Sequence, residues 1–282
     1  IDCKNCKSRF RCDHLIEETL GKNADGLTVQ EMSEIVKKEK VKCPKCGAED
    51  FTDAKFFNLM FHTHMSKTGR DADVAYLRPE TAQSIFVDFK NVLNTMRVKI
   101  PFGIAQIGKA FRNEITPGNF VFRVIEFEQM EIEYFIRESH WERTFEEWLH
   151  AMQNWCKMIG LNPARLHLKE HPKEQLSHYS KRTVDIVYDF PFGSSELYGL
   201  ASRTDFDLMR HAEFSGHPLE YIDPETQEKF VPHVIEPTFG VERTLLALLC
   251  DAYDEEQLEN GETRTVLHLA PRIAPVKVAI FP

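Results

Sequence analysis

The chain has 282 residues, 42% of them hydrophobic, which is enough for one large core and a smaller appendage. Its net charge of −9 and isoelectric point near 5.8 argue weakly against nucleic-acid binding, because proteins that bind phosphates usually show a basic patch. No run of about 18 apolar residues occurs, which excludes a membrane span.

Four of the seven cysteines form two Cys-x-x-Cys pairs: Cys3, Cys6, Cys43 and Cys46. Each pair can present two thiolates to one tetrahedral zinc ion, and four protein ligands would make the site structural. Without a visible signal peptide, the pairs indicate a reduced, cytoplasmic protein with a metal site rather than disulfides. Two alternatives stay open, a pair of metal-free turns and a site in which Cys12 or His14 replaces a cysteine.

The segment between the pairs and the segment after them predict a helix, a strand and a second helix. Thr28 and Glu31 form a capping box that opens the first helix. The apolar segment 56–65 predicts a packed strand. Its His62 and His64 could bind a metal ion, but a packed strand is favoured because no third ligand lies nearby. Pro79 suits a helix start, and apolar residues follow it at helical spacing: Ile85, Phe86, Phe89, Val92, Leu93 and Met96.

The stretch 111–131 predicts two strands joined by a loop with turn formers at 116–119. In the first strand, Arg112 and Glu114 would leave the same face. In the second, alternate residues are mostly polar: Phe127, Gln129, Glu131 and Glu133. Such a face suits the floor of a polar ligand site, and the alternative is a hairpin with a solvated charged side.

A second capping box, at Ser139 and Glu142, opens a helix that ends at Gly160. It carries an apolar stripe typical of a packing surface: Trp141, Phe145, Trp148, Met152, Trp155 and Ile159. The polar segment 161–182 predicts an irregular surface connection.

The remaining segments alternate between strands and polar connections. Strands are predicted at 184–188, 195–202, 231–235, 265–269 and 276–281. Glu196, Tyr198 and Leu200 would share one face of the second of these. Polar connections are predicted at 211–229 and 254–262. The stretch 236–243 reads as a strand end, a glycine and an arginine in the first turn of an apolar helix.

Four ordered motifs carry a family resemblance. Residues 111–127 resemble motif 2 of class II aminoacyl-tRNA synthetases, and 240–243 before an apolar helix resemble motif 3. Residues 77–83, Leu-Arg-Pro-Glu-Thr-Ala-Gln, and 236–238, Glu-Pro-Thr, narrow the likeness to the dimeric glycyl-tRNA synthetases. The resemblance covers essentially the whole chain.

The resemblance implies an α+β class II catalytic domain, an antiparallel sheet flanked by helices, with a zinc-knuckle insertion. We expect the insertion at 1–55, the catalytic domain at 56–263, and a linker with the first strand of a truncated anticodon-binding domain at 264–282. Because the chain opens on Ile1, we expect a fragment, with the motif 1 helix and its dimer interface before that residue.

The resemblance also implies an ATP site in which Arg112 and Arg243 are catalytic. Arg112 would contact the α-phosphate and Arg243 the γ-phosphate, while Glu196 would hold Mg²⁺ and Phe127 would stack on adenine. The whole expected set is Arg112, Asn113, Glu114, Phe122, Arg123, Val124, Ile125, Glu126, Phe127, Glu196, Leu197, Gly240, Val241, Glu242 and Arg243.

The implied glycine site uses carboxylates for the ammonium group and Arg203 for the carboxylate. Thr238 departs from the family, which usually has serine there. The whole expected set is Glu80, Phe127, Glu128, Gln129, Met130, Glu131, Arg203, Glu236, Pro237, Thr238, Phe239 and Gly240.

The implied function is ATP-dependent formation of glycyl-adenylate and its transfer to tRNA(Gly), by a cytoplasmic homodimer with zinc and magnesium and no membrane association. The alternatives are a class II paralogue that serves another acceptor and a non-catalytic tRNA-binding relative. The set of Arg112, Glu114, Glu196 and Arg243 argues against the non-catalytic alternative, because a binding module has no reason to keep them together.

Overall fold

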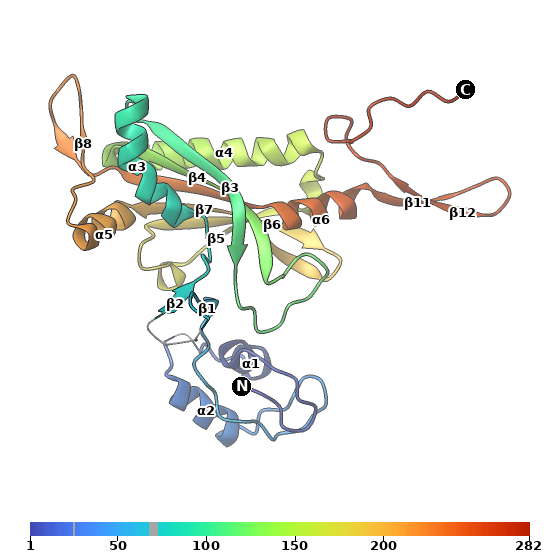
Figure 1. Ribbon diagram of the computed structural model, residues 1–282. Helices are drawn as coiled ribbons and strands as arrows, with labels where there is room; N and C mark the ends of the chain where they lie inside the picture. Colours follow the sequence, from blue (N-terminus) through green and yellow to red (C-terminus); the bar gives the residue numbers. More distant parts are fainter. Residues whose placement is uncertain (25, 68–72) are drawn as a thin grey trace. The chain divides into compact units, whose positions relative to one another are not determined.

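The structure is a computed structural model that describes residues 1–24, 26–67 and 73–282. The chain divides into two compact units, described separately below (Figure 1). Unit 1 comprises Ile1–Pro79 and Phe111–Ile125, and unit 2 comprises Glu80–Ala110 and Glu126–Pro282. The domain boundaries expected after residues 55 and 263 stay predictions.

Unit 1 contains two helices, α1 (Cys12–Leu20) and α2 (Val29–Lys38), and one short strand pair, β1 (His62–His64) with β2 (Val74–Tyr76). The predicted capping box of α2 is confirmed, because the Thr28 side chain accepts from the Glu31 N–H and the Glu31 carboxylate accepts from the Thr28 N–H. The two helices pack on a small buried core: Leu15, Ile16, Val36, Val41 and Phe51.

The packed strand predicted at 56–65 is wrong. Only three of its residues are in a strand, and His62 and His64 are both exposed. Phe56 and Met65 are 87% and 82% exposed, so the apolar segment does not enter a core of the described chain. The apolar run therefore gave a false strand signal.

Unit 2 is built on a six-stranded sheet with the order β3-β4-β10-β7-β6-β5 (Figure 1). The pairings of β4 with β10, β10 with β7, β7 with β6 and β6 with β5 are antiparallel. The strand bounds are β3 Phe102–Phe111, β4 Glu126–Ile136, β5 Leu166–Glu170, β6 Arg182–Phe190, β7 Gly193–Thr204 and β10 His233–Gly240.

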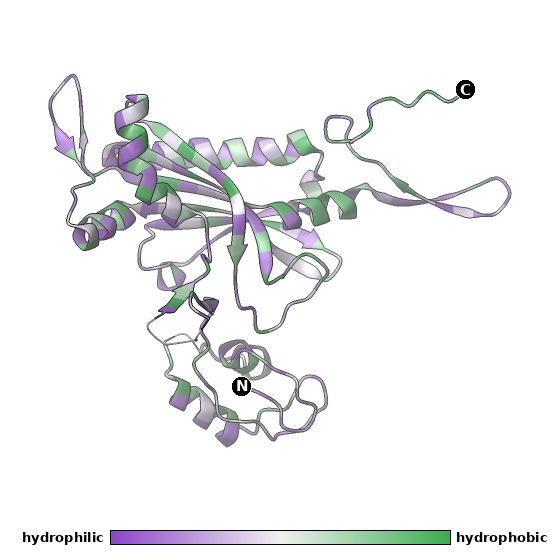
Figure 2. Ribbon diagram, viewed as in Figure 1, coloured by the Kyte–Doolittle hydropathy of each residue, from purple (hydrophilic) through white to green (hydrophobic). Residues whose placement is uncertain are grey.

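Helices cover both faces of this sheet. On one face, Phe86 and Phe89 of α3 (Ala82–Met96) pack against Phe135 of β4, in a cluster that also contains Leu208 of α5 (Phe206–Ser215). On the other face lies α4 (Trp141–Ile159), whose apolar and polar positions alternate around the helix (Figure 2). Its predicted stripe and its end at Gly160 are confirmed.

The remaining elements are short or peripheral. α6 (Val241–Ala252) follows β10, and two hairpins pair β8 (Tyr221–Ile222) with β9 (Lys229–Phe230) and β11 (Tyr253–Gln257) with β12 (Thr263–Leu267). Among the described residues, 3₁₀ turns lie at Glu138–His140, Pro163–Arg165 and Lys173–Gln175. Among the described residues, no helix is both long and apolar enough to cross a membrane.

Three further expectations about local structure are wrong. Arg112 and Glu114 do not lie in a strand, because β3 ends at Phe111. The capping box at Ser139 does not form, because Ser139 lies in a 3₁₀ turn and the cap of α4 is His140, without a side-chain bond. The segment 276–281 forms no strand, and its apolar side chains are exposed.

Three segments predicted to be connections contain regular structure. Within 211–229, α5 continues to Ser215 and β8 forms at Tyr221–Ile222. Within 161–182, β5 forms the edge of the sheet, where polar side chains can face solvent. Within 254–262, acidic residues of β11 pair with β12, and Glu256 lies opposite Arg264 with 2.6 Å between Oε2 and Nη2. Cross-strand charge pairing therefore offsets the poor strand propensity of glutamate there.

Replacing Phe135 tests the packing of α3 on the sheet. Its ring is fully buried, and the centre of the ring lies 4.6 Å from the ring centre of Phe89 and 5.2 Å from that of Phe102. Phe135→Ala should lower the free energy of unfolding by about 3–5 kcal/mol in chemical denaturation. Val87→Ala, at a position 63% exposed on α3, should change it by about 0.5 kcal/mol or less. A loss below about 1 kcal/mol for Phe135→Ala would contradict this packing.

Candidate active site

The polar face of β4 is buried. Gln129, Glu131 and Glu133 are 6%, 2% and 0% exposed, so the alternative of a solvated charged side is wrong. The same face continues at Phe135 into the apolar cluster under α3. These acids therefore lie in the interior of unit 2, where a carboxyl group needs partners.

The neighbouring strands add further polar groups to this face. Thr238 of β10 lies opposite Glu131, and Ile235 lies opposite Tyr134. That register sets Glu236 opposite Glu133. On the other side of β10, Gly199 and Ala201 of β7 lie opposite Thr238 and Glu236, so only short side chains flank them.

Arg203, at the end of β7, is the cation at the centre of this cluster. It is 2% exposed, and its Nη1 donates to Glu236 at 2.7 Å. Its Nε and Nη2 donate to the two carboxylate oxygens of Asp207 at 2.8 and 3.0 Å. The Glu80 carboxylate lies 3.8 Å from Nη2, and the guanidinium carbon lies 4.3 Å from the centre of the Tyr179 ring. Arg203 is thus fixed by groups from several elements.

Acidic groups outnumber the cation: Glu80, Glu131, Glu133, Asp207 and Glu236 surround Arg203. Burial raises the pKa of Glu131, and the charge of Glu80 adds to the rise. Burial also raises the pKa of Glu236 to about 7, although the charge of Arg203 opposes the rise. For Arg203, burial acts to lower the pKa, but the charge of Glu236 and the bond to Asp207 outweigh it and raise the pKa.

The start of α3 holds two of these acids in place. Glu131 Oε2 accepts from the Thr81 N–H at 2.7 Å and from the Thr81 hydroxyl. The Gln83 amide donates to Glu80 and to Asp207, each at 3.0 Å. Because the NH₂ group of Gln83 donates to two carboxylates, its side-chain carbonyl is left to accept from His211 Nε2, at 2.8 Å. The corner after Pro79 is therefore part of the site.

The expected site sets left out four residues of this cluster: Thr81, Gln83, Asp207 and Glu133, the last of which had been placed only on the polar face of the strand. The signal for Asp207 was its spacing of four from Arg203, which joins the end of β7 to the first turn of α5. Thr81 and Gln83 lay within the stretch 77–83 that carries the resemblance. Glu133 has the same parity as Glu131, and only its burial separates it from a solvated residue.

Four residues expected in the glycine site lie at positions of the opposite face. Met130 and Phe239 lie opposite each other, and the Phe239 ring packs against Trp155 and Tyr198. Pro237 has the same parity as Phe239, so it also faces α4. Glu128 lies on that parity too and forms an ion pair with Lys109, 3.7 Å apart.

The junction of β10 and α6 places Arg243 beside Glu196. Arg243 Nη1 donates to the Glu196 carbonyl at 3.0 Å and lies 3.5 Å from its carboxylate. Glu242, which is expected to contact ATP, accepts from the Glu128 N–H with both carboxylate oxygens, at 3.0 and 2.9 Å. Its carboxylate thus ties α6 to β4. Leu197 is buried, Phe127 is partly buried, and Gly240 and Val241 form the junction itself.

The other residues expected at ATP belong to unit 1, apart from Glu126, which opens β4 in unit 2. Arg112 donates to the Pro79 carbonyl at 3.0 Å, and its N–H donates to Ile125 at 2.9 Å. Gly118 and Arg123 exchange two backbone bonds, at 3.0 and 3.2 Å, which close the predicted loop. The rest of the set within unit 1 is Asn113, Glu114, Phe122 and Val124.

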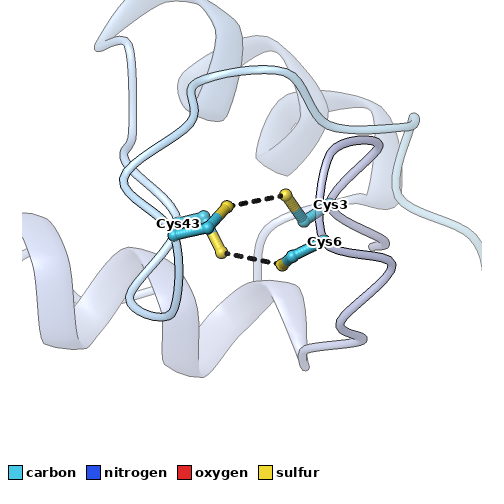
Figure 3. A group of neighbouring side chains, drawn as sticks. Cys3, Cys6 and Cys43 are labelled. Carbon is cyan, nitrogen blue, oxygen red and sulfur yellow. Dashed lines mark hydrogen bonds between the residues drawn. The ribbon is translucent and has the colours of Figure 1, made fainter.

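The predicted cysteine cluster forms in unit 1. The sulfur atoms of Cys3, Cys6, Cys43 and Cys46 all lie within 4.8 Å of one another, and Figure 3 shows side chains from the two pairs pointing together. Cys3 and Cys46 sulfurs are 3.6 Å apart, and those of Cys6 and Cys43 are 3.7 Å apart. A tetrahedral zinc with bonds of about 2.3 Å requires sulfur separations of about 3.8 Å, so the cluster fits zinc. Neither Cys12 nor His14 belongs to the group.

Comparisons with known proteins identify the family of the chain. Residues 64–252 match the family described as tRNA synthetase class II core domain (G, H, P, S and T). The chain is 53%, 52% and 54% identical to glycine–tRNA ligases of Geobacillus kaustophilus, Geobacillus thermodenitrificans and Caldanaerobacter subterraneus subsp. tengcongensis. Each alignment covers 100% of the chain, which spans 62% of the length of these relatives. The α+β fold with an antiparallel sheet flanked by helices is thereby confirmed, and the chain belongs to the class II aminoacyl-tRNA synthetase core-domain family.

Proposed function

We propose that the protein activates glycine with ATP to glycyl-adenylate and transfers the glycyl group to tRNA(Gly). The observation that carries this proposal is the buried cluster of carboxyl groups around Arg203. Glycine offers only an ammonium and a carboxylate, and this cluster supplies partners for both. The names of the relatives, glycine–tRNA ligases, support the same substrate.

In this proposal, Glu131, Glu236 and Glu80 bind the ammonium group and Arg203 binds the carboxylate. The three bonds from Arg203 to Glu236 and Asp207 use three of the five N–H donors of a guanidinium. Thr238 lies opposite Glu131 in the strand register, and its methyl group, which serine lacks, would narrow the site. Every competing amino acid would add atoms to a filled space, so size alone can select the smallest substrate without editing.

Activation requires attack of the glycine carboxylate on the α-phosphorus of ATP, which releases pyrophosphate. Catalysis then consists of positioning and charge neutralisation, for which the guanidinium groups of Arg112 and Arg243 are suited. Glu196 is partly exposed beside Arg243, so its carboxylate can hold Mg²⁺ together with phosphate oxygens. Glu242 is excluded from direct contact in our proposal, because it already binds the β4 backbone.

The proposal further includes a structural zinc at the four cysteines, a homodimer and a cytoplasmic location. The zinc would be held by Cys3, Cys6, Cys43 and Cys46 and would cross-link the two knuckles of unit 1. No observation favours the class II paralogue or the non-catalytic relative over the glycine enzyme.

Pyrophosphate exchange by the complete protein, measured with each amino acid in turn, tests the substrate. Glycine should support exchange, while alanine and serine should be at least about a hundredfold poorer in kcat/KM, because their side chains clash in a filled site. Exchange with a different amino acid would overturn the glycine assignment, and no exchange with any would favour the non-catalytic alternative.

Glu131→Gln keeps the shape of a proposed ammonium ligand and removes its charge. The loss of a hydrogen bond to a charged group costs about 1.5–3 kcal/mol, so the KM for glycine should rise at least about tenfold while the KM for ATP stays nearly constant. Glu138→Gln, at a side chain 68% exposed just after β4, is the matched control and should change neither. An equal rise in the KM for ATP would place Glu131 in the nucleotide site.

Arg112→Ala removes a proposed contact to the α-phosphate. Losing one charge-assisted contact in the transition state is worth about 3 kcal/mol, or roughly a hundredfold in exchange rate. Circular dichroism and the melting temperature should stay close to those of the wild type. Exchange within about threefold of the wild-type rate would refute the role of Arg112.

Cys43→Ser tests the zinc proposal through metal content. The complete protein should contain one zinc per chain by mass spectrometry of metals, and the variant should lose it. Cys12→Ala is the control, because Cys12 lies outside the sulfur cluster and should leave the zinc in place. Zinc-free wild-type protein, purified without chelators, would contradict the proposal, and zinc loss in Cys12→Ala would change the ligand set.

A further inference from the structure

Glu133 is a buried acid to which the proposed mechanism assigns no role. It is 0% exposed and lies on β4 between Glu131 and Phe135, at the boundary of the acidic cluster and the apolar cluster. Among the described residues, neither carboxyl oxygen has a partner in good hydrogen-bond geometry. The sheet register sets Glu236 directly opposite it.

Two buried carboxyl groups directly across a strand pair repel each other strongly if both are ionised. Cross-strand β-carbons are about 4.5–5.5 Å apart, which lets the two side chains meet. A proton shared between them removes this repulsion, as in other carboxyl pairs of enzyme sites. The pair Glu133–Glu236 therefore has a physical reason to hold one proton.

The surroundings decide which member of the pair carries the negative charge. Glu236 accepts a bond from Arg203 of β7 at 2.7 Å, which favours its ionised form. Glu133 has two acids close to it, Glu131 on its own strand and Glu236 on β10. The other acids of the cluster, Glu80 before α3 and Asp207 on α5, lie beside Arg203. The proton thus belongs chiefly to Glu133.

The pKa directions agree with this placement. Burial raises the pKa of Glu133 well above its ordinary value, the charge of Glu236 adds to the rise, and Arg203 offsets it only in part. Burial also raises the pKa of Glu236, but both the charge of Arg203 and its hydrogen bond to Glu236 oppose that rise.

We propose that Glu133 and Glu236 share one proton while the site is empty, and that the ammonium group of a bound amino acid expels this proton to solvent. The identity of that ammonium as glycine rests on the function proposed above. Glu133 is then a positioning residue that acts through Glu236. Its proton lowers the negative charge of the empty site, and its departure supplies a second carboxylate when the cation arrives.

The sign of the pH dependence follows from this exchange. A bound cation favours the ionised pair, so the pair has a lower pKa in the complex than in the empty protein. Binding therefore releases protons at pH values between the two pKa values, and glycine affinity rises as the pH rises through that window. In Glu133→Gln, the neutral amide cannot share a proton with Glu236, so this dependence should weaken.

Calorimetry of glycine binding to the complete protein near pH 7, in two buffers of different ionisation enthalpy, counts the released protons. The wild type should release at least about 0.3 proton per site, and Glu133→Gln should bind glycine with less than about half of that release. Between about pH 6 and pH 8, wild-type affinity should rise about three- to tenfold, while that of Glu133→Gln should rise by a clearly smaller factor. Glu138→Gln should behave as the wild type.

Two results would overturn the proposal. One is glycine binding to the wild type without proton release, and the other is undiminished release by Glu133→Gln, which would place the proton on another acid. Infrared spectroscopy of the wild-type protein without glycine tests the pair directly. This measurement requires neither glycine binding nor a variant that folds. A protonated-carboxyl band should be present at neutral pH and fade at alkaline pH, and its absence overturns the proposal. If the band is present but the protein does not bind glycine, only the proposed function is contradicted.

Discussion

The buried guanidinium of Arg203, set among more carboxyl groups than it can neutralise, is the interaction on which unit 2 depends. Burying unpaired charge is costly, so each acid must be bonded, protonated or compensated. Asp207 and Glu236 bond Arg203, and Thr81 bonds Glu131. These partners come from β4, β7, β10 and the starts of α3 and α5, which explains why those elements converge. The cluster still lacks positive charge, and a small ammonium ion is the ligand that would supply it.

Sequence periodicity was enough to predict the elements that pack regularly but not the environment of their polar faces. Strands β6, β7 and β10 and helix α4 follow clear apolar patterns and were predicted close to their observed bounds. The alternation in β4 was also visible, but the sequence pattern would be the same whether Glu133 lay on a solvated face or, as observed, in the interior. Burial on that face is decided by α3 and α5, which pack over it from distant parts of the chain.

The family motifs contain residues of the acidic cluster and also residues whose side chains pack or bond elsewhere. The motif 3 stretch includes Glu242, whose carboxylate bonds the Glu128 N–H and joins α6 to the sheet. The Phe239 side chain packs against Tyr198 on the face of the sheet that α4 covers, although Phe239 is adjacent in sequence to Thr238 of the acidic face. A motif is contiguous in sequence, but a strand sends alternate side chains to opposite faces, so only part of it can contact one ligand.

A crystal structure of the complete protein with bound glycine would test the central claim most directly. The account predicts the ammonium nitrogen within about 2.7–3.2 Å of carboxylate oxygens of Glu131 and Glu236, with the glycine carboxylate directed to Arg203. Glycine bound in the reverse orientation, or bound away from the cluster around Arg203, would contradict it.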